Sequence, residues 1–161
     1  MGEQTVQLDP LDARLISLLA AEPRIGVLEL SRRLAVARGT VQARLDKLIA
    51  RGAIKGFGPE VAPDVIGFGV TSFVTLEIIQ RYGHDAVAEH LAEIPEVLEA
   101  HTITGGGDIL CRIVARSNAD LQRVIDQIVG YAGIGRAHTI IALAELIPYR
   151  TVPLVRSAIR S

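Results

Sequence analysis

The first half of the chain places apolar residues at the spacing of amphipathic helices. Four leucines stand at positions i, i+4, i+7 and i+8, which share one face of a helix: Leu11, Leu15, Leu18 and Leu19. Asp9 is typical of an N-cap and Pro10 of the first helical position, while Pro23 ends the segment. The pattern therefore predicts a first helix that begins at Pro10 and stops before Pro23.

Two further helices follow at short intervals. Gly26 is an acceptable N-cap with Glu29 at the third helical position, and the buried face of this second helix is marked by Leu30 and Leu34. A third helix is expected over 37–51, with Gly52 as its C-cap. Its apolar stripe consists of Val41, Leu45, Leu48 and Ile49.

Residues 54–69 interrupt the helical pattern and are predicted to be a linker. This segment holds four glycines and two prolines, which favour turns over regular elements. A short strand is expected near Ile54–Gly58. The boundary divides the chain into a helical domain over 1–53, the linker, and a second domain over 70–161.

In the second half, patterns typical of strands alternate with patterns typical of helices. The expected strands are 70–79, 97–104, 108–115 and 137–147, where β-branched and other apolar residues are frequent. One helix is expected over 85–94, and another after Ser117, which forms a capping box with Asp120. The order βαββαβ predicts a ferredoxin-like α+β sandwich.

Such a sandwich leaves one face of its sheet without helices of its own. The apolar residues expected to cover this face include Val70, Val74, Leu76, Ile109, Ile113, Ile141 and Leu143. An exposed apolar face favours association, and a two-fold homodimer is the commonest solution. The sequence therefore predicts that this domain pairs with a second copy of itself.

Charge is distributed unevenly between the two halves. Residues 1–57 carry nine Lys and Arg against six Asp and Glu, whereas residues 58–161 carry eight against twelve. Residues 29–57 alone carry seven basic and two acidic side chains. A basic block within an acidic chain indicates that the first domain meets a polyanion and the second does not.

Composition argues against several classes of protein. Aromatic residues make up 4% of the 161 residues and Trp is absent, which disfavours platforms that stack nucleobases. Cys111 is the only cysteine, so neither a disulfide framework nor a multi-cysteine zinc site is expected. Neither a membrane-spanning run nor a signal peptide is recognisable, so we expect a cytoplasmic protein with no membrane partner.

The second and third helices, joined by a short turn at 35–37, meet the minimum pattern of a helix-turn-helix. In this motif the N-terminal part of the second helix reads base edges in the major groove of double-stranded DNA. Gly39 and Ala43 lie nearly opposite the buried stripe, and small side chains there allow close approach to DNA. Donors for bases or phosphates flank them, namely Arg38, Thr40 and Gln42.

Other basic side chains in this half suit phosphate contacts, which position a domain without reading sequence: Arg32, Arg33, Arg44, Lys47 and Arg51. Arg44 lies near the buried edge of its helix, where pairing with Asp12, Glu22 or Asp46 is the alternative. A plain three-helix bundle with solvated surface arginines is the competing interpretation of the whole half.

The order of motifs resembles the Lrp/AsnC, or feast/famine, family of transcriptional regulators over about residues 8–148. The shared features are L-D-x-x-D at the first helix, R-I before the second, L-S-x-x-L within it, T-V-x-x-R-L-x-x-L in the third and G-x-I-x-G-F after it. In the second half they are T-G-G-G-D-I-L over 104–110 and the last strand around Thr139.

This resemblance implies a prokaryotic regulator that associates with the nucleoid when bound to a pseudo-palindromic DNA site. It also implies that an amino acid or related small molecule binds between the sensing domains of neighbouring dimers, within a higher oligomer such as an octamer. The implied effector residues are Thr104, Gly105, Gly106, Gly107, Asp108, Thr139 and Ile141. Physically, a glycine loop can bind a carboxylate through its N–H groups, and Asp108 can pair with an ammonium group.

The sequence departs from the family pattern at two positions. Ala37 replaces the serine usual at the start of the reading helix, which puts the phosphate contact there in doubt. Gly107 replaces a larger residue before Asp108, which predicts a wider or looser pocket. A plain hairpin turn is the alternative role of the three glycines.

Two alternative functions remain at this point. A sensor that has lost DNA binding is compatible with Ala37. Siroheme decarboxylases resemble the same two-domain layout, and His101 and His138 are the residues to examine for such an enzyme. His84 and His90 are poorly spaced for one helical face, and Cys111 lies in a strand pattern, so no catalytic residue, metal or cofactor is expected.

Overall fold

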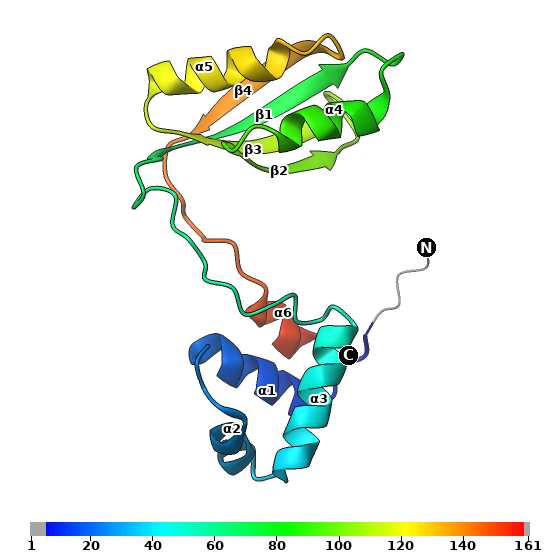
Figure 1. Ribbon diagram of the computed structural model, residues 1–161, viewed down its shortest axis with the longest axis vertical. Coiled ribbons are helices and arrows are strands. Elements are labelled where there is room, and N and C mark those ends of the chain that lie inside the picture. The colour runs from blue at the N-terminus through cyan, green and yellow to red at the C-terminus, as the bar shows by residue number, and fades with distance from the viewer. Residues whose placement is uncertain (1–5, 160–161) are drawn as a thin grey trace. The chain divides into compact units, whose positions relative to one another are not determined.

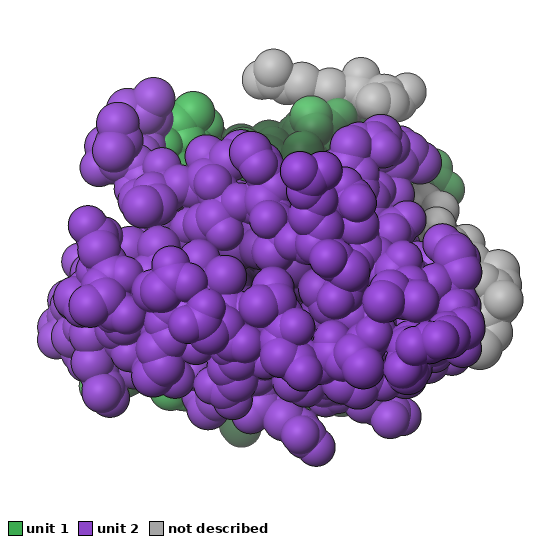
Figure 2. Space-filling view, turned by 90° about the horizontal axis from the view of Figure 1, so that it is seen from above, with its two compact units in different colours: residues 1–59, 147–161 green, residues 60–146 purple. Residues whose placement is uncertain are grey.

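The computed structural model describes residues 6–159, so the outermost residues of both predicted domains (1–5 and 160–161) lie outside the described part. The chain divides into two compact units, one of residues 1–59 with 147–161 and the other of residues 60–146 (Figure 2). The chain therefore passes from one unit to the other twice.

The first unit contains the three predicted helices, α1 (Pro10–Ala21), α2 (Val27–Leu34) and α3 (Arg38–Ala50) (Figure 1). The Asp9 carboxylate accepts hydrogen bonds from the backbone N–H groups of Leu11 and Asp12, both at 2.9 Å. The Asp12 carboxylate in turn accepts from the N–H of Asp9 at 3.2 Å. This reciprocal cap satisfies donors that the first helical turn leaves free, and it confirms Asp9 as the N-cap.

An aliphatic core joins these helices. Its most deeply buried side chains, at 0–3% exposure, are Leu15, Leu30, Leu34, Val41 and Leu48. The helical stripes predicted them all. Ile49 is the exception, because its side chain is 42% exposed. The tight turn between α2 and α3 requires a left-handed backbone at Ala35, where φ is 57°.

A fourth helix, α6 (Val152–Ser157), belongs to this unit and packs against α1. The sequence analysis assigned residues 147–161 to the second domain, because chain order was the only guide. The partly buried side chains of Val152, Val155 and Ile159 are spaced for one helical face, and α1 supplies the surface that covers them.

The strand expected near Ile54–Gly58 is absent from the described structure, and residues 56–62 have no regular secondary structure. The N–H of Ile54 instead donates to the carbonyl of Leu48 at 3.2 Å and closes the end of α3. A strand needs a neighbouring strand for its N–H and C=O groups, and none of the described segments pairs with this one.

The second unit is the predicted βαββαβ sandwich. Its elements are β1 (Val70–Ile78), α4 (Gly83–Ala92), β2 (Val97–Thr102), β3 (Ile109–Ala115), α5 (Asn118–Val129) and β4 (Ile134–Ala142). The strands form one antiparallel sheet in the order β2-β3-β1-β4 (Figure 1). The Ser117 hydroxyl accepts the N–H of Asp120 at 3.1 Å, as the predicted capping box requires. The Asp120 carboxylate accepts the N–H of Arg116, one residue before the N-cap position that a capping box uses.

The last strand lies earlier in the chain than the predicted 137–147. Its register against β1 runs from Ile134 opposite Ile78 to Ala142 opposite Thr71. Because β1 begins at Val70, residues beyond 142 have no strand beside them. Leu143 and Leu146 therefore leave the sheet, with side chains 98% and 91% exposed.

Alternate residues of each strand face the two helices. The prediction for the uncovered face of the sheet was wrong for at least four of its residues, which lie on the helix-covered side. Val74, Leu76, Ile109 and Ile113 are 0–4% exposed, in one core with Val87 of α4 and Val124 of α5. They therefore lie beneath the helices. A shift of one residue in a strand exchanges the faces, and a nearly continuous apolar run does not reveal which parity is inside.

The opposite side of the sheet carries no helix of its own unit and is called the open face here. It is formed by residues one step away from the buried set, namely Thr71, Phe73, Thr75, Leu110, Arg112, His138 and Ile140. Phe73 lies at its centre, opposite Arg112 on β3 and Ile140 on β4. The Phe73 and Ile140 side chains are 37% and 57% exposed.

Within residues 6–159, every helix is too short or too polar to cross a membrane.

Candidate functional site

The outer face of α3 is the candidate nucleic-acid surface. A shallow hollow of about 490 Å³ runs along it, lined by Asp9, Gly39, Thr40, Ala43, Arg44 and Lys47. The predicted reading residues Arg38, Gly39, Thr40, Gln42 and Ala43 are all exposed, because Val41 and Leu48 turn the opposite side of α3 into the core. The helix thus presents small residues between polar ones, and a helix of this diameter fits the major groove.

Ala37 occupies the N-cap of α3 and provides no side-chain hydrogen bond. The departure from the family pattern at this position therefore leaves the first N–H groups of α3 without a hydroxyl cap. Such N–H groups at a helix N-terminus are suited to an anion. The exposed side chains of Arg38 and Thr40 follow directly and are available beside them.

Arg44 does not lie free on this surface. Its guanidinium pairs with the carboxylates of Asp9 and Asp12, at 2.8 Å from Oδ1 of Asp12. The side-chain hydrogen bond with Asp9 is the main cause that raises the pKa of Arg44. Of the alternatives left open by the sequence, pairing with Asp12 is the one found, and the pair ties the N-terminus of α1 to α3.

Asp9→Ala is expected to lower the free energy of unfolding of the helical unit by about 0.5–2 kcal/mol, the usual cost of a lost N-cap. In the folded unit, the N–H of Asp12 and then the Arg44 guanidinium hold the pKa of Asp9 below its ordinary value. The stabilisation by this carboxylate is therefore complete above about pH 4 and is lost as pH falls through the lower folded pKa.

Urea unfolding followed by circular dichroism at pH 7 and pH 3 measures this effect. Asp9→Asn is the matched control, because asparagine also caps helices but carries no charge. It should retain most of the stability at pH 7 and lose the acid dependence assigned to Asp9. Equal stability of all three proteins at pH 7 would contradict the role of Asp9 as a cap.

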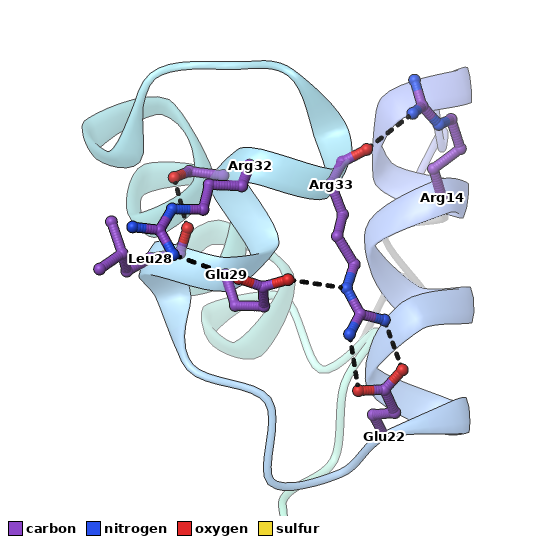
Figure 3. Close-up of polar contacts among 7 residues, drawn as sticks. Arg14, Glu22, Leu28, Glu29, Arg32 and Arg33 are labelled. Atoms are coloured by element: carbon purple, nitrogen blue, oxygen red, sulfur yellow. Dashed lines mark hydrogen bonds and ion pairs between the residues drawn. The ribbon is translucent and has the colours of Figure 1, made fainter.

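Arg33, a predicted phosphate contact, is also occupied by carboxylates (Figure 3). Its Nη2 lies 3.1 Å from Oε2 of Glu22, and its Nε lies 3.1 Å from Oε1 of Glu29. The hydrogen bond with Glu22 is the main cause that raises the pKa of Arg33. The side chain thereby links the end of α1 to α2, and a phosphate would have to compete with two carboxylates for it.

The other predicted phosphate contacts are more available. Arg32 approaches Glu29 only at 3.6 Å, with a side chain 67% exposed. Lys47 and Arg51 are exposed on or just after α3. The Gln42 amide donates to the carboxylate of Asp46 at 2.8 Å on the exposed surface of α3. A base edge can replace Asp46 as its partner. The phosphate and base contacts themselves remain predictions.

The glycine loop of the second unit is a turn between β2 and β3. The N–H of Ile103 donates to the carbonyl of Asp108 at 3.0 Å, and the N–H of Gly107 donates to the carbonyl of Gly105 at 3.0 Å. The φ angles of Gly105 and Gly107 are 111° and 131°, a region that other residues avoid. Thr104, Gly105 and Gly106 are exposed, so part of the predicted effector loop is open to a ligand.

Asp108 has a structural partner that the sequence did not indicate. Its carboxylate accepts the N–H of Ile78 at 2.7 Å, where the pairing of β1 and β4 shifts register. Its own N–H donates to the carbonyl of Leu76 at 2.8 Å. Asp108 therefore fastens the glycine loop to the end of β1, besides any contact with an effector.

The space beside Gly107 is already filled by Thr75. A Cβ atom at position 107 would lie 2.2 Å from Cγ2 of Thr75 and 3.3 Å from the carbonyl oxygen of Leu76. The prediction that Gly107 leaves a wider pocket therefore does not fit the structure. A larger residue at position 107 would be strained at this φ and would require the Thr75 side chain to move.

Thr139 and Ile141 lie on the far side of β1 from the glycine loop. In the register, Thr139 is opposite Val74 and Ile141 opposite Ser72, whereas the loop joins β1 at Leu76 and Ile78. One chain thus does not gather all seven predicted effector residues into one pocket.

The residues considered for an enzyme do not assemble into a catalytic group. His101 on β2 and His138 on β4 occupy opposite edge strands of the sheet. Nε2 of His101 lies 3.6 Å from Oε2 of Glu99. Burial raises the pKa of the Cys111 thiol to about 11, which suits a core residue and not a nucleophile. The described residues contain no cluster of three or more His, Cys, Asp or Glu side chains placed for a metal.

Comparison with known protein families agrees with the two units. Residues 8–55 match the family of winged helix-turn-helix DNA-binding domains. Residues 71–152 match the Lrp/AsnC ligand-binding domain. The two matches cover the first three helices and the sandwich except its first residue, Val70.

Individual proteins give the same result. The HTH-type transcriptional regulator FL11 of Pyrococcus horikoshii is 28% identical over 138 residues, which is 86% of this chain and 91% of the relative. An uncharacterised HTH-type transcriptional regulator of Pyrococcus abyssi is 32% identical over 142 residues, or 84% and 92% of the two chains.

Two solved structures are similar along nearly their whole length. Escherichia coli AsnC superposes with a TM-score of 0.85 at 27% identity, over 92% of this chain and all of that one. The feast or famine regulatory protein of Mycobacterium tuberculosis, complexed with L-methionine, has a TM-score of 0.80 at 25% identity, over 89% and 97% of the two chains.

Proposed function

Because this chain belongs to the Lrp/AsnC family of DNA-binding transcriptional regulators, we propose that α3 reads its DNA site and that an amino acid bound by the second unit controls the binding. The observation that carries the proposal is the exposed face of α3, where Gly39 and Ala43 lie between donors. Neither catalysis nor a cofactor is part of the proposal.

DNA recognition on this surface divides into two kinds of contact. Gln42 carries an amide that suits the N6 and N7 atoms of adenine, and Arg38 a guanidinium that suits guanine. Arg32, Lys47 and Arg51 supply phosphate contacts, which add affinity on any sequence. Arg33 and Arg44 instead connect the helices to one another through their carboxylate partners.

A homodimer formed through the open face presents two copies of α3 to a pseudo-palindromic site. Phe73 and Ile140 give this face an apolar centre, and a two-fold axis through it brings identical surfaces together. Assembly of dimers into a higher oligomer would let glycine loops and β4 residues of different chains form one effector site, consistent with their separation within a single chain.

The effector proposed for this site is an amino acid. The mycobacterial relative was solved with L-methionine, and the exposed N–H groups of a glycine loop suit a carboxylate. An effector changes DNA binding only if it binds one assembly state more tightly than another. The differential contact is expected at the glycine loop, which Asp108 fastens to β1.

Gln42→Ala is expected to weaken binding to the cognate operator by about 1–3 kcal/mol, the usual value of one bidentate base contact. Binding to random duplex DNA should change little. Fluorescence-anisotropy titrations of DNA upstream of the protein's own coding region, with random duplex as competitor, measure both affinities at fixed salt.

Arg51→Ala is the matched control, because a phosphate contact should weaken both DNAs and reduce the salt slope of binding by about one unit. Equal losses on operator and random DNA for Gln42→Ala would contradict base reading by Gln42. If the unaltered protein binds every tested promoter no more tightly than random DNA, the result would instead favour a sensor without DNA binding.

Asp108→Asn is expected to abolish the effect of amino acids on DNA binding while the protein remains folded. Asparagine keeps an oxygen that can accept the N–H of Ile78 but loses the charge that pairs with an ammonium group. DNA affinity without effector should be unchanged. The measurement is the operator titration with and without a panel of L-amino acids that includes L-methionine.

Asp108→Ala serves as the comparison, because it also removes the acceptor for a buried N–H, at a cost of about 1–3 kcal/mol. A full response in Asp108→Asn with a destabilised Asp108→Ala protein would assign Asp108 a structural role only.

A further inference from the structure

The contact between α1 and α6 contains a second hollow, which the DNA-reading and sensing roles do not use. Its volume is about 350 Å³, and it is lined by Ala13, Arg14, Ser17, Leu18, Arg33, Arg156 and Ile159. Three of these seven residues are arginines and none is acidic. Arg156 and Ile159 come from the C-terminal segment, so docking of α6 completes the hollow.

The arginines differ in how their charge is balanced. The Arg33 guanidinium is neutralised by Glu22 and Glu29. Arg14 donates only to the backbone carbonyl of Arg33, at 3.4 Å (Figure 3). Among the residues that the structure describes, neither Arg14 nor Arg156 forms an ion pair. Docking of α6 therefore places a guanidinium without a carboxylate partner in a hollow that already holds another, and like charges repel.

An oxyanion in the hollow would remove this repulsion. Guanidinium groups bind phosphate and carboxylate oxygens through paired N–H donors, and the Ala13, Leu18 and Ile159 side chains provide an apolar wall beside them. Because the anion would contact both α1 and α6, its binding and the docking of the C-terminal segment are thermodynamically linked.

The hollow is separate from the surface that faces α3. On α1, Asp12, Leu15 and Leu19 point toward Arg44 and the helical core. Ala13, Arg14 and Ser17 lie on the other side of the same helix, since positions three and four apart share a face. Leu18 lies at the edge between the two sides, where it also packs against the helical core. An anion bound there is therefore not expected to be a phosphate of the DNA that α3 reads.

We propose that the hollow between α1 and α6 binds a small phosphate-bearing anion, whose phosphate oxygens are held by Arg14 and Arg156. The bound anion fastens the C-terminal segment to the DNA-reading unit. This site goes beyond the proposed amino-acid site, which lies in the other unit, and it does not depend on it.

The test is differential scanning calorimetry of the full chain in sodium phosphate and in sodium chloride of equal ionic strength and pH. The unfolding temperature of the helical unit should be a few degrees higher in phosphate, because a ligand that binds only the native state stabilises it. Phosphate also stabilises proteins without binding them, so the informative quantity is the difference between variants.

The phosphate increment is the rise in unfolding temperature in phosphate relative to chloride. In Arg156→Gln and in Arg14→Gln it should be smaller than in the unaltered protein, because only the stabilisation that does not need the site remains. Arg24→Gln removes the same charge from an exposed position between α1 and α2 and should keep the full increment of the unaltered protein. Arg14 lies on the core helix α1, so its variant tests the site even if Arg156→Gln releases α6.

Salt titrations of operator binding distinguish the two sources of phosphate. An unchanged salt slope in Arg156→Gln, with loss of the phosphate increment, assigns the site to a free anion. A slope reduced by about one unit assigns it to the DNA backbone. If all variants keep both the full phosphate increment and the salt slope, the hollow is no anion site and the proposal is wrong.

Discussion

Leu15→Ala is expected to unfold the DNA-reading unit at ambient temperature or bring it close to its midpoint. Leu15 is completely buried at the centre of the three-helix core. Truncation of such a leucine costs about 2–5 kcal/mol through lost burial and the remaining cavity. A helical unit of this size has little stability to spare, so a single cavity removes most of it.

Operator binding should therefore be lost, while the sensing unit, whose core is separate, remains folded. Circular dichroism should show reduced helix content, and calorimetry should retain the transition of the sandwich. Leu28→Ala on α2 is the control, since that side chain is 51% exposed and its truncation should change little. Full operator affinity in Leu15→Ala would show that the unit repacks or that DNA binding does not need this core.

Phe73→Lys is expected to abolish the proposed homodimer, so that the protein is a monomer at micromolar concentration. Phe73 lies at the centre of the open face, directly opposite Arg112 and Ile140. A two-fold contact doubles the effect of any change near its axis, and a lysine there adds charge next to Arg112 and to the partner's own lysine. Arg112 already has Glu99 as its partner, at 3.1 Å. The added lysine ammonium groups would therefore be buried without a carboxylate partner, which costs several kcal/mol.

Sedimentation velocity or light scattering measures the mass directly. Val129→Lys is the matched control, because Val129 is 38% exposed against 37% for Phe73 but lies at the C-terminus of α5, where a cation is tolerated. This variant should keep the mass of the unaltered protein. A folded Phe73→Lys protein of unchanged mass would contradict dimer formation through the open face.

Local signals in the sequence predicted most of the elements. Asp9 with Pro10 marked the start of α1, and the Leu15 and Val41 stripes identified two buried helix faces. Caps and helical periodicity depend on residues three or four positions apart, so they are readable without the fold. Strand parity was not readable in the same way: Val74 and Leu76 were assigned to the wrong face, because only the packed helices define which side is inside.

The candidate site divides in the same manner. The exposed positions of α3 followed from the helical wheel, so Gly39, Thr40 and Gln42 were found from sequence. For Arg44 the sequence offered several carboxylates without deciding between them, and its partner Asp9 lies 35 residues away in the chain. The pairing of Arg33 with Glu22, 11 residues away, was not indicated. The bond from Ile78 to Asp108 spans 30 residues and was invisible for the same reason.

By itself, the sequence determined the family, the two-part organisation, the order of α1 to α5 and β1 to β4, and the exposed face of α3. These features rest on composition and on patterns shorter than one element. The tertiary structure alone decided which arginines are neutralised, where β4 ends, which sheet face is open and that α6 joins the DNA-reading unit. Each of those depends on a contact between distant segments, and the energy of such a contact is set by the geometry of the fold and not by neighbours in the chain.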